Sequence, residues 1–156
     1  MGTVSRLGLR VAFKGIPGDR SYLEIDAWMP SEVEAISPLV DWAIRLIEES
    51  QCVVGHEKTI ELALREALSN AAVHGNKLDS EKLVHVQCQC EGEKGASVIV
   101  TDDGQGFDPN GVADPLATER LEAEHGRGIH LMKLAMDEVS FARGGTEVRM
   151  RKGPGK

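Results

Sequence analysis

Three polar side chains recur every four residues along one largely apolar stretch of the sequence. Glu66, Asn70 and His74 therefore project from the same side of a helix, if a helix forms there. A carboxylate and an amide oxygen one turn apart can bind a hard cation and position a nucleophile. For this stretch taken alone, a solvated polar stripe is the simpler interpretation.

A second group of candidate residues follows an apolar strand and runs from Asp102 to Gly106. The Asp102 carboxylate can accept a hydrogen bond from a ligand, while Gly104 and Gly106 let the backbone approach that ligand closely. A turn that happens to contain acidic residues explains the same pattern equally well.

The third group is Gly126, Arg127 and Gly128, directly before a stretch that we expect to be a short helix. Glycines that open a helix leave unpaired N–H groups and the positive end of the helix dipole for phosphate oxygens. Arg127 would add a charge-assisted contact. A lone Gly-x-Gly is weak evidence, because loops use glycine constantly, and the sequence contains no Walker A pattern.

The elements that must position these groups begin with two strands, in residues 7–15 and 21–30, separated by a glycine- and proline-containing turn. A helix that ends near Ser50 follows. Its start is open: Ser31 begins a capping-box pattern, whereas Pro38 fits a start near Ser37 or a kink.

The helix that carries the first group is the clearest element, because apolar residues recur at helical spacing over residues 57–74. Gly75 stands where a left-handed cap would end it. His74 and Asn76 either line the edge of a site or cap the end of this helix.

The C-terminal half alternates strands with one long loop. We expect strands in residues 82–91 and 96–103, and then a loop over residues 104–126 whose length is typical of a functional segment. A short helix over residues 127–136 and a hairpin across Gly144-Gly145 complete the chain. This order predicts an α+β fold, a two-layer sandwich with helices on one face of a mixed, mostly antiparallel sheet.

Length and charge bound the function. The 156 residues suit a single domain over 1–156, and the net charge of −7 argues against nucleic-acid binding through a broad basic surface. We expect neither a membrane span nor a signal peptide. Cys88 and Cys90 share one strand face and cannot easily bridge each other, so with Cys52 they are predicted to be free thiols in the cytoplasm.

Taken together, the three groups resemble the motifs of the Bergerat-type (GHKL) ATPases. The stretch ELALREALSNAAVHGNK resembles the N box of that superfamily, TDDGQGF its first glycine box, and GRGIHLM its second. Within the superfamily the chain is most similar to the anti-sigma-factor serine/threonine kinases, which share the segments 66–71, 136–139 and 145–148. The match covers residues 28–152, and the N-terminal hairpin in residues 1–27 fits more loosely.

The resemblance implies a Bergerat fold that binds ATP and Mg²⁺. Asn70 would be the Mg²⁺ ligand, and Glu66 would be the general base that takes the proton from a serine hydroxyl. Asp102 would accept the adenine amino proton, with Thr146 reaching the adenine from the last strand.

The glycines have implied roles too. Gly104 and Gly106 would let the backbone approach the base. Gly126, Arg127 and Gly128 would cover the phosphates at the hinge of a lid that spans residues 107–125.

The function that the resemblance implies is an ATP-dependent anti-sigma factor. It would bind a sigma factor and phosphorylate a serine of an anti-anti-sigma antagonist, without direct contact to nucleic acid or membrane, and as a possible homodimer. The alternative is an ATP-binding regulatory module that sequesters a protein partner without phosphotransfer.

Overall fold

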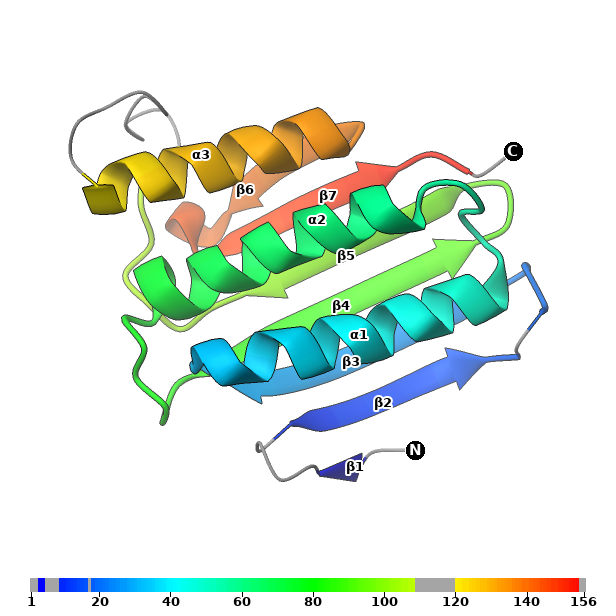
Figure 1. Ribbon diagram of the computed structural model, residues 1–156, viewed down its shortest axis with the longest axis horizontal. Helices are drawn as coiled ribbons and strands as arrows, with labels where there is room; N and C mark the ends of the chain where they lie inside the picture. Colours follow the sequence, from blue (N-terminus) through cyan, green and yellow to red (C-terminus); the bar gives the residue numbers. More distant parts are fainter. Residues whose placement is uncertain (1–2, 5–8, 17, 109–119, 155–156) are drawn as a thin grey trace.

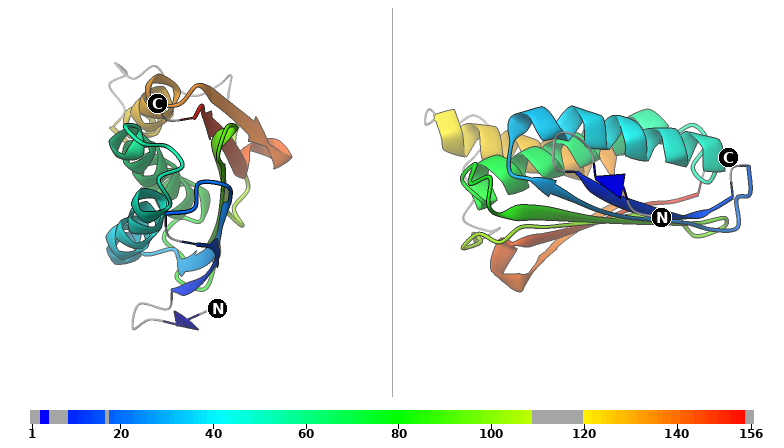
Figure 2. Two further views of the ribbon diagram at one scale, coloured as in Figure 1. Left: turned by 90° about the vertical axis from the view of Figure 1, so that its right-hand side faces the viewer. Right: turned by 90° about the horizontal axis from the view of Figure 1, so that it is seen from below.

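The computed structural model describes residues 3–4, 9–16, 18–108 and 120–154. These form two layers, with three helices lying over one face of a single sheet (Figure 1). The end-on view in Figure 2 shows the opposite face of the sheet without a covering helix. Among the described residues, no helix has the length and apolar character that crossing a bilayer requires.

The sheet contains seven strands in the spatial order β1-β2-β3-β4-β5-β7-β6. Their bounds are Thr3–Val4 (β1), Arg10–Gly15 (β2), Leu23–Pro30 (β3), Leu83–Glu91 (β4), Gly95–Thr101 (β5), Glu138–Ala142 (β6) and Glu147–Lys152 (β7). Every pairing among them is antiparallel, and β5 and β7 lie side by side although α3 and β6 separate them in the chain. The predicted α+β sandwich is confirmed, with the short β1 as an additional strand.

Alternation along the central strands creates the core. In β3, Leu23, Ile25, Ala27 and Met29 are buried under the helices, and the residues between them face the uncovered side. The strand β4 repeats this pattern, because its register pairs Ile25 with Cys88. One apolar layer between sheet and helices therefore fixes the register of the sheet.

The helix α1 spans Val33–Ser50 and contains Pro38 in its second turn. Its N-cap residue is Glu32, and no side chain caps the helix. The expected capping box is wrong because Ser31 is fully buried and its hydroxyl donates to the Lys82 carbonyl, 2.7 Å away. The side chain that resembled a cap instead connects the end of β3 to the start of β4.

The helix α2 spans Glu57–Ser69 and continues directly into a π-helical turn over Asn70–Gly75. Gly75 does not take the left-handed conformation of a cap, which Lys77 and Leu78 adopt instead. A Cβ at Gly75 would lie 2.4 Å from Asp102 Oδ2, so glycine is required here for close packing and not for a positive φ. The expected cap is therefore wrong.

The helix α3 spans Arg120–Ala135 and packs against α2. It begins before the second glycine box, so the expected start at residue 127 is wrong, and residues 120–126 are helical where a loop was expected. Residues 109–119 of the expected lid lie outside the described residues. The hairpin of β6 and β7 is confirmed, with a 3-10 turn over Arg143–Gly145 between them.

A disulfide joins Cys52, in the connection between α1 and α2, to Cys90 near the end of β4. Their Cα atoms are 6.1 Å apart, and both side chains are buried. The prediction of three free thiols is therefore wrong for this pair, because the α1–α2 connection folds back onto the helix-facing side of β4. Cys88 remains free and buried, and burial raises its pKa to about 12.

Candidate functional site

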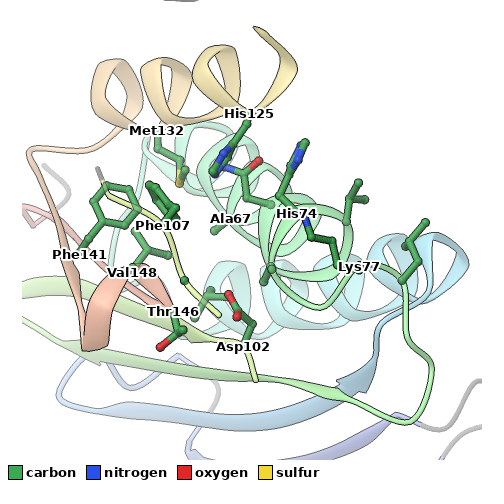
Figure 3. Close-up of a pocket in the computed structure, with 18 residues that line it drawn as sticks. Ala67, His74, Lys77, Asp102, Phe107, His125, Met132, Phe141, Thr146 and Val148 are labelled. Atoms are coloured by element: carbon green, nitrogen blue, oxygen red, sulfur yellow. The ribbon is translucent and has the colours of Figure 1, made fainter. Parts of the chain in front are cut away.

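A cavity of about 500 Å³ lies between the C-terminal half of α2, the helix α3 and the ends of β5 and β7 (Figure 3). Its lining combines apolar side chains with a few polar ones, as is typical of a small-molecule site. The residues that line it are Ala67, Asn70, Ala71, Val73, His74, Gly75, Lys77, Leu78, Val100, Asp102, Gly106, Phe107, His125, Met132, Phe141, Gly145, Thr146 and Val148.

Asp102 stands directly after β5, on the sheet side of this cavity, beside Thr146 (Figure 3). Its Oδ1 accepts the Gly104 N–H at 2.8 Å, and its own N–H donates to the Thr146 carbonyl at 2.9 Å. Burial raises the pKa of Asp102, an effect that the Gly104 hydrogen bond partly opposes. The strand end thus presents a fixed, half-buried carboxylate to the cavity.

The first glycine box lies too close to neighbouring backbone to carry side chains. A Cβ at Gly104 would lie 2.1 Å from the Gly75 carbonyl oxygen, and one at Gly106 would lie 2.0 Å from the Gly144 oxygen. Gly106 also has a φ of +78°, which favours glycine. These contacts attach the turn after β5 both to the π-helical end of the α2 segment and to the β6–β7 connection.

Asn70 lines the same cavity from the helix layer, as the first residue of the π-helical turn. Its Nδ2 is buried and has no hydrogen-bond partner among the described residues. Such a group costs free energy unless a ligand or water satisfies it. An unpaired buried amide at a cavity wall is typical of a residue that forms a hydrogen bond with a bound ligand or coordinates it.

Glu66 lies one helical turn before Asn70 and does not line the cavity itself. Both side chains face α3: a Cβ at Gly128 would lie 3.0 Å from Glu66 Oε2 and 3.1 Å from Asn70 Oδ1. A Cβ at this position would make tight contacts, so glycine lets the backbone of α3 approach both side chains closely. Burial raises the pKa of Glu66, which brings this carboxyl group nearer to the range of a general base at neutral pH.

The second glycine box does not open a helix. Gly126, Arg127 and Gly128 lie inside α3, so their N–H groups fall beyond the first turn that a helix leaves unpaired. Arg127 is exposed, and none of the three lines the cavity. The expectation that these residues present free N–H groups to phosphates is wrong for this conformation, because the helix begins about two turns earlier than the sequence indicated.

An aromatic cluster closes one side of the cavity, and no motif in the sequence indicated it. The His125 ring stacks on His74 with centroids 4.6 Å apart, and Phe107 meets His125 edge-on at 4.6 Å. Phe141 packs against Phe107 in turn. Burial, with the positive charges of His74 and Lys77, lowers the pKa of His125 to about 4, so the ring is neutral at pH 7. Four segments far apart in sequence supply these rings, so no spacing rule could group them.

The site therefore fits an adenine nucleotide with Mg²⁺. The cavity volume lies within the range of small-molecule sites, and the Asp102 carboxylate can accept a proton from an exocyclic amine. The Asn70 amide without a partner lines the same cavity, and turning it over would present its oxygen, a ligand that Mg²⁺ accepts, in the same position.

Comparison with known proteins agrees with this geometry. Residues 29–152 match the family described as the histidine kinase-like ATPase domain. Over 98 residues the chain is 35% identical to an Anti-sigma F factor of Clostridium novyi (strain NT). This aligned region covers 60% of the present chain and 68% of that relative. An Anti-sigma F factor of Clostridium perfringens (strain SM101 / Type A) is likewise 35% identical over 99 residues, or 60% and 69% of the two chains.

With its antiparallel sheet, its helices on one face and its match over residues 29–152, the chain belongs to the histidine kinase-like ATPase domain family. Its similarity to the two Anti-sigma F factors confirms the more particular resemblance to the anti-sigma-factor kinase family.

Proposed function

We propose that this protein is an ATP-dependent anti-sigma factor that phosphorylates a serine of an anti-anti-sigma antagonist. The names of the clostridial relatives support the sigma-factor partner, and the family supports ATP as the nucleotide. One observation carries the proposal: Asp102 and Asn70 line a single cavity, with Glu66 one turn before Asn70.

In this proposal Asp102 recognises the adenine amino group, and Thr146 and the close backbone at Gly104 and Gly106 shape the base site. Asn70 holds Mg²⁺. Bound Mg-ATP supplies the phosphoryl group and neutralises charge, so the protein has to supply mainly position. Gly126, Arg127 and Gly128 reach the phosphates after the start of α3 rearranges.

Glu66 takes the proton from the antagonist's serine hydroxyl. Its raised pKa favours that role, because a more basic carboxylate accepts a proton more readily. Glu66 is half-buried, and the backbone of α3 at Gly128 lies close to its carboxylate in the described conformation.

The test is phosphate transfer to the antagonist, measured as a mass increase on a serine after incubation with Mg-ATP. Glu66→Gln should abolish the transfer and keep ATP binding. Glu61→Gln is the matched control, because Glu61 lies on the same helix and pairs with the partly exposed Arg65. Equal transfer by wild type and Glu66→Gln would remove Glu66 from the reaction.

A second candidate is an ATP-binding module that holds its partner without phosphotransfer. The position of Glu66 favours it, because this residue is not part of the cavity lining in the described conformation. Partner binding that depends on ATP, with no phosphate on the partner under any condition, would establish this candidate over the kinase.

We also propose a cytoplasmic location, a possible homodimer and no direct contact with nucleic acid or membrane. The disulfide bears on the location, since the cytoplasm of most bacteria keeps thiols reduced. Alkylating thiols in rapidly quenched cells measures this directly: Cys52 and Cys90 should be labelled if the protein works in such a compartment.

A further inference from the structure

Asn76 is fully buried although it stands near the end of the N box, in what looks like a surface turn. It does not line the cavity, so it is not a contact residue for the nucleotide. A buried amide must form hydrogen bonds or cost free energy. One partner of this amide lies in the turn after β5, residues 102–106, which carries Asp102 and is called the base-recognition turn below.

The Asn76 side chain joins three segments that are distant in sequence. Its Oδ1 accepts the Asp103 N–H at 2.8 Å. Its Nδ2 donates to Ser31 Oγ at 2.8 Å and to the Leu83 carbonyl at 3.2 Å. Since Ser31 donates onward to Lys82, the network runs from the turn after β5 to the junction of β3, α1 and β4.

This network completes the immobilisation of the base-recognition turn. Three consecutive N–H groups are bonded there: Asp102 to the Thr146 carbonyl, Asp103 to Asn76, and Gly104 to the Asp102 carboxylate. Asn76 supplies the only one of these three acceptors that is a side chain from another element. Without Asn76, the N–H of Asp103 would lose its acceptor, and fewer hydrogen bonds would hold the turn that carries the Asp102 carboxylate.

We propose that Asn76, held by Ser31, is a positioning residue that sets the Asp102 carboxylate for selection of adenine nucleotides. This inference rests on the proposed function, in which Asp102 accepts the adenine amino proton. Precise placement matters because a hydrogen bond weakens steeply with misalignment, whereas stacking and phosphate contacts tolerate small shifts.

The inference is tested by comparing the affinity for ATP with that for an analogue lacking the purine amino group. Asn76→Ala should weaken ATP binding about tenfold and change binding of the analogue by less than about twofold. The ratio of the affinity for ATP to the affinity for the analogue should therefore fall. Ser31→Ala should lower this ratio too, by a smaller factor. A merely structural role would lower both affinities together and leave the ratio unchanged.

Ser50→Ala is the matched control. Ser50 is also a buried serine that donates to a backbone carbonyl, but it lies at the other end of α1 and has no link to Asp102. It should therefore leave the ratio unaltered. Should Asn76→Ala fail to fold, Ser31→Ala decides, together with hydrogen exchange at the Asp103 amide, which should be faster than in wild type.

The outcomes distinguish failure of the proposed role of Asp102 from failure of the positioning role of Asn76. A wild type that binds ATP and the analogue equally overturns the role of Asp102, and the inference falls with it. A wild-type preference for ATP that persists in folded Asn76→Ala and Ser31→Ala, with unchanged Asp103 exchange, overturns the inference alone.

Discussion

The two ends of α2 differ in how completely their groups are satisfied. At the N-terminal end, the disulfide attaches the connection between α1 and α2 to β4, and the buried Ser50 hydroxyl donates to the Ile47 carbonyl. At the C-terminal end, the helix becomes a π-helical turn with an orphaned amide at Asn70 and a carboxyl at Glu66 whose pKa is raised by burial. One end stabilises the fold, whereas the other keeps unsatisfied groups of the kind that a ligand uses.

The largest effect expected from this contrast is on stability, at the disulfide end. Reducing the Cys52–Cys90 bond, or Cys90→Ser, should lower the free energy of unfolding by about 4 kcal/mol, since it opens a loop of 38 residues in the unfolded chain. Denaturant unfolding of oxidised and reduced protein measures it. Cys88→Ala, at a free neighbouring thiol, is the control. A strong change in ATP affinity on reduction would contradict the separation of the two ends.

The next largest effect is on binding, at the site end. Asp102→Asn should weaken ATP binding by about 2–3 kcal/mol, roughly a hundredfold, because a carboxylate acceptor is replaced. The melting temperature should not fall, since the substitution removes a half-buried carboxyl whose ionised form burial disfavours. Calorimetry and thermal melting measure the two quantities. Asp103→Asn, at the exposed neighbouring residue, should leave both unchanged.

A smaller effect on stability is expected at Asn70, and its sign is opposite to that of removing the disulfide. Asn70→Ala should raise the free energy of unfolding by about 1 kcal/mol, because a buried group without a partner is removed. The same variant should lose the Mg²⁺ dependence of nucleotide affinity. Titrations with and without Mg²⁺ test this, with Ser69→Ala as the neighbouring control. Destabilisation, or retained Mg²⁺ dependence, would contradict the contrast between the two ends.

The last expected effect is the pH dependence that His125 causes. Its pKa falls from the usual 6.5 to about 4 in the folded protein, so the unfolded chain binds the extra proton between these values. The contribution of His125 to the free energy of unfolding is therefore fully present above pH 6.5 and decreases as the pH falls toward 4. Melting at pH 7 and pH 5 should show a smaller decrease for His125→Phe than for wild type. His130→Phe, at an exposed position on the same helix, should resemble wild type.

The sheet and the two long helices could be predicted from the sequence because local patterns determine them. Alternation in β3 and β4 and helical spacing in α2 are properties of short segments. The failures occurred where tertiary contacts decide. Ser31 has the local pattern of a cap but bonds to Lys82, and Gly75 has the position of a cap but packs on Asp102.

The candidate site was predictable to the extent that motifs carry it. Asn70, Asp102, Gly106 and Thr146 do meet at one cavity, whereas Glu66, Gly104 and the second glycine box lie beside it. The roles assigned to these residues, like the single domain over 1–156, stay predictions. The aromatic cluster and the Cys52–Cys90 pairing could not be predicted, because each joins residues that only the folded chain brings together.

The disulfide also changes how the chain would respond to a protease. The covalent loop that it closes contains α2, the π-helical turn and most of β4. The exposed turn at residues 77–81 lies within that loop and is a natural point of cleavage. A cut there would leave two fragments joined through Cys52 and Cys90, so the nicked protein would keep its apparent mass in denaturing electrophoresis until it was reduced.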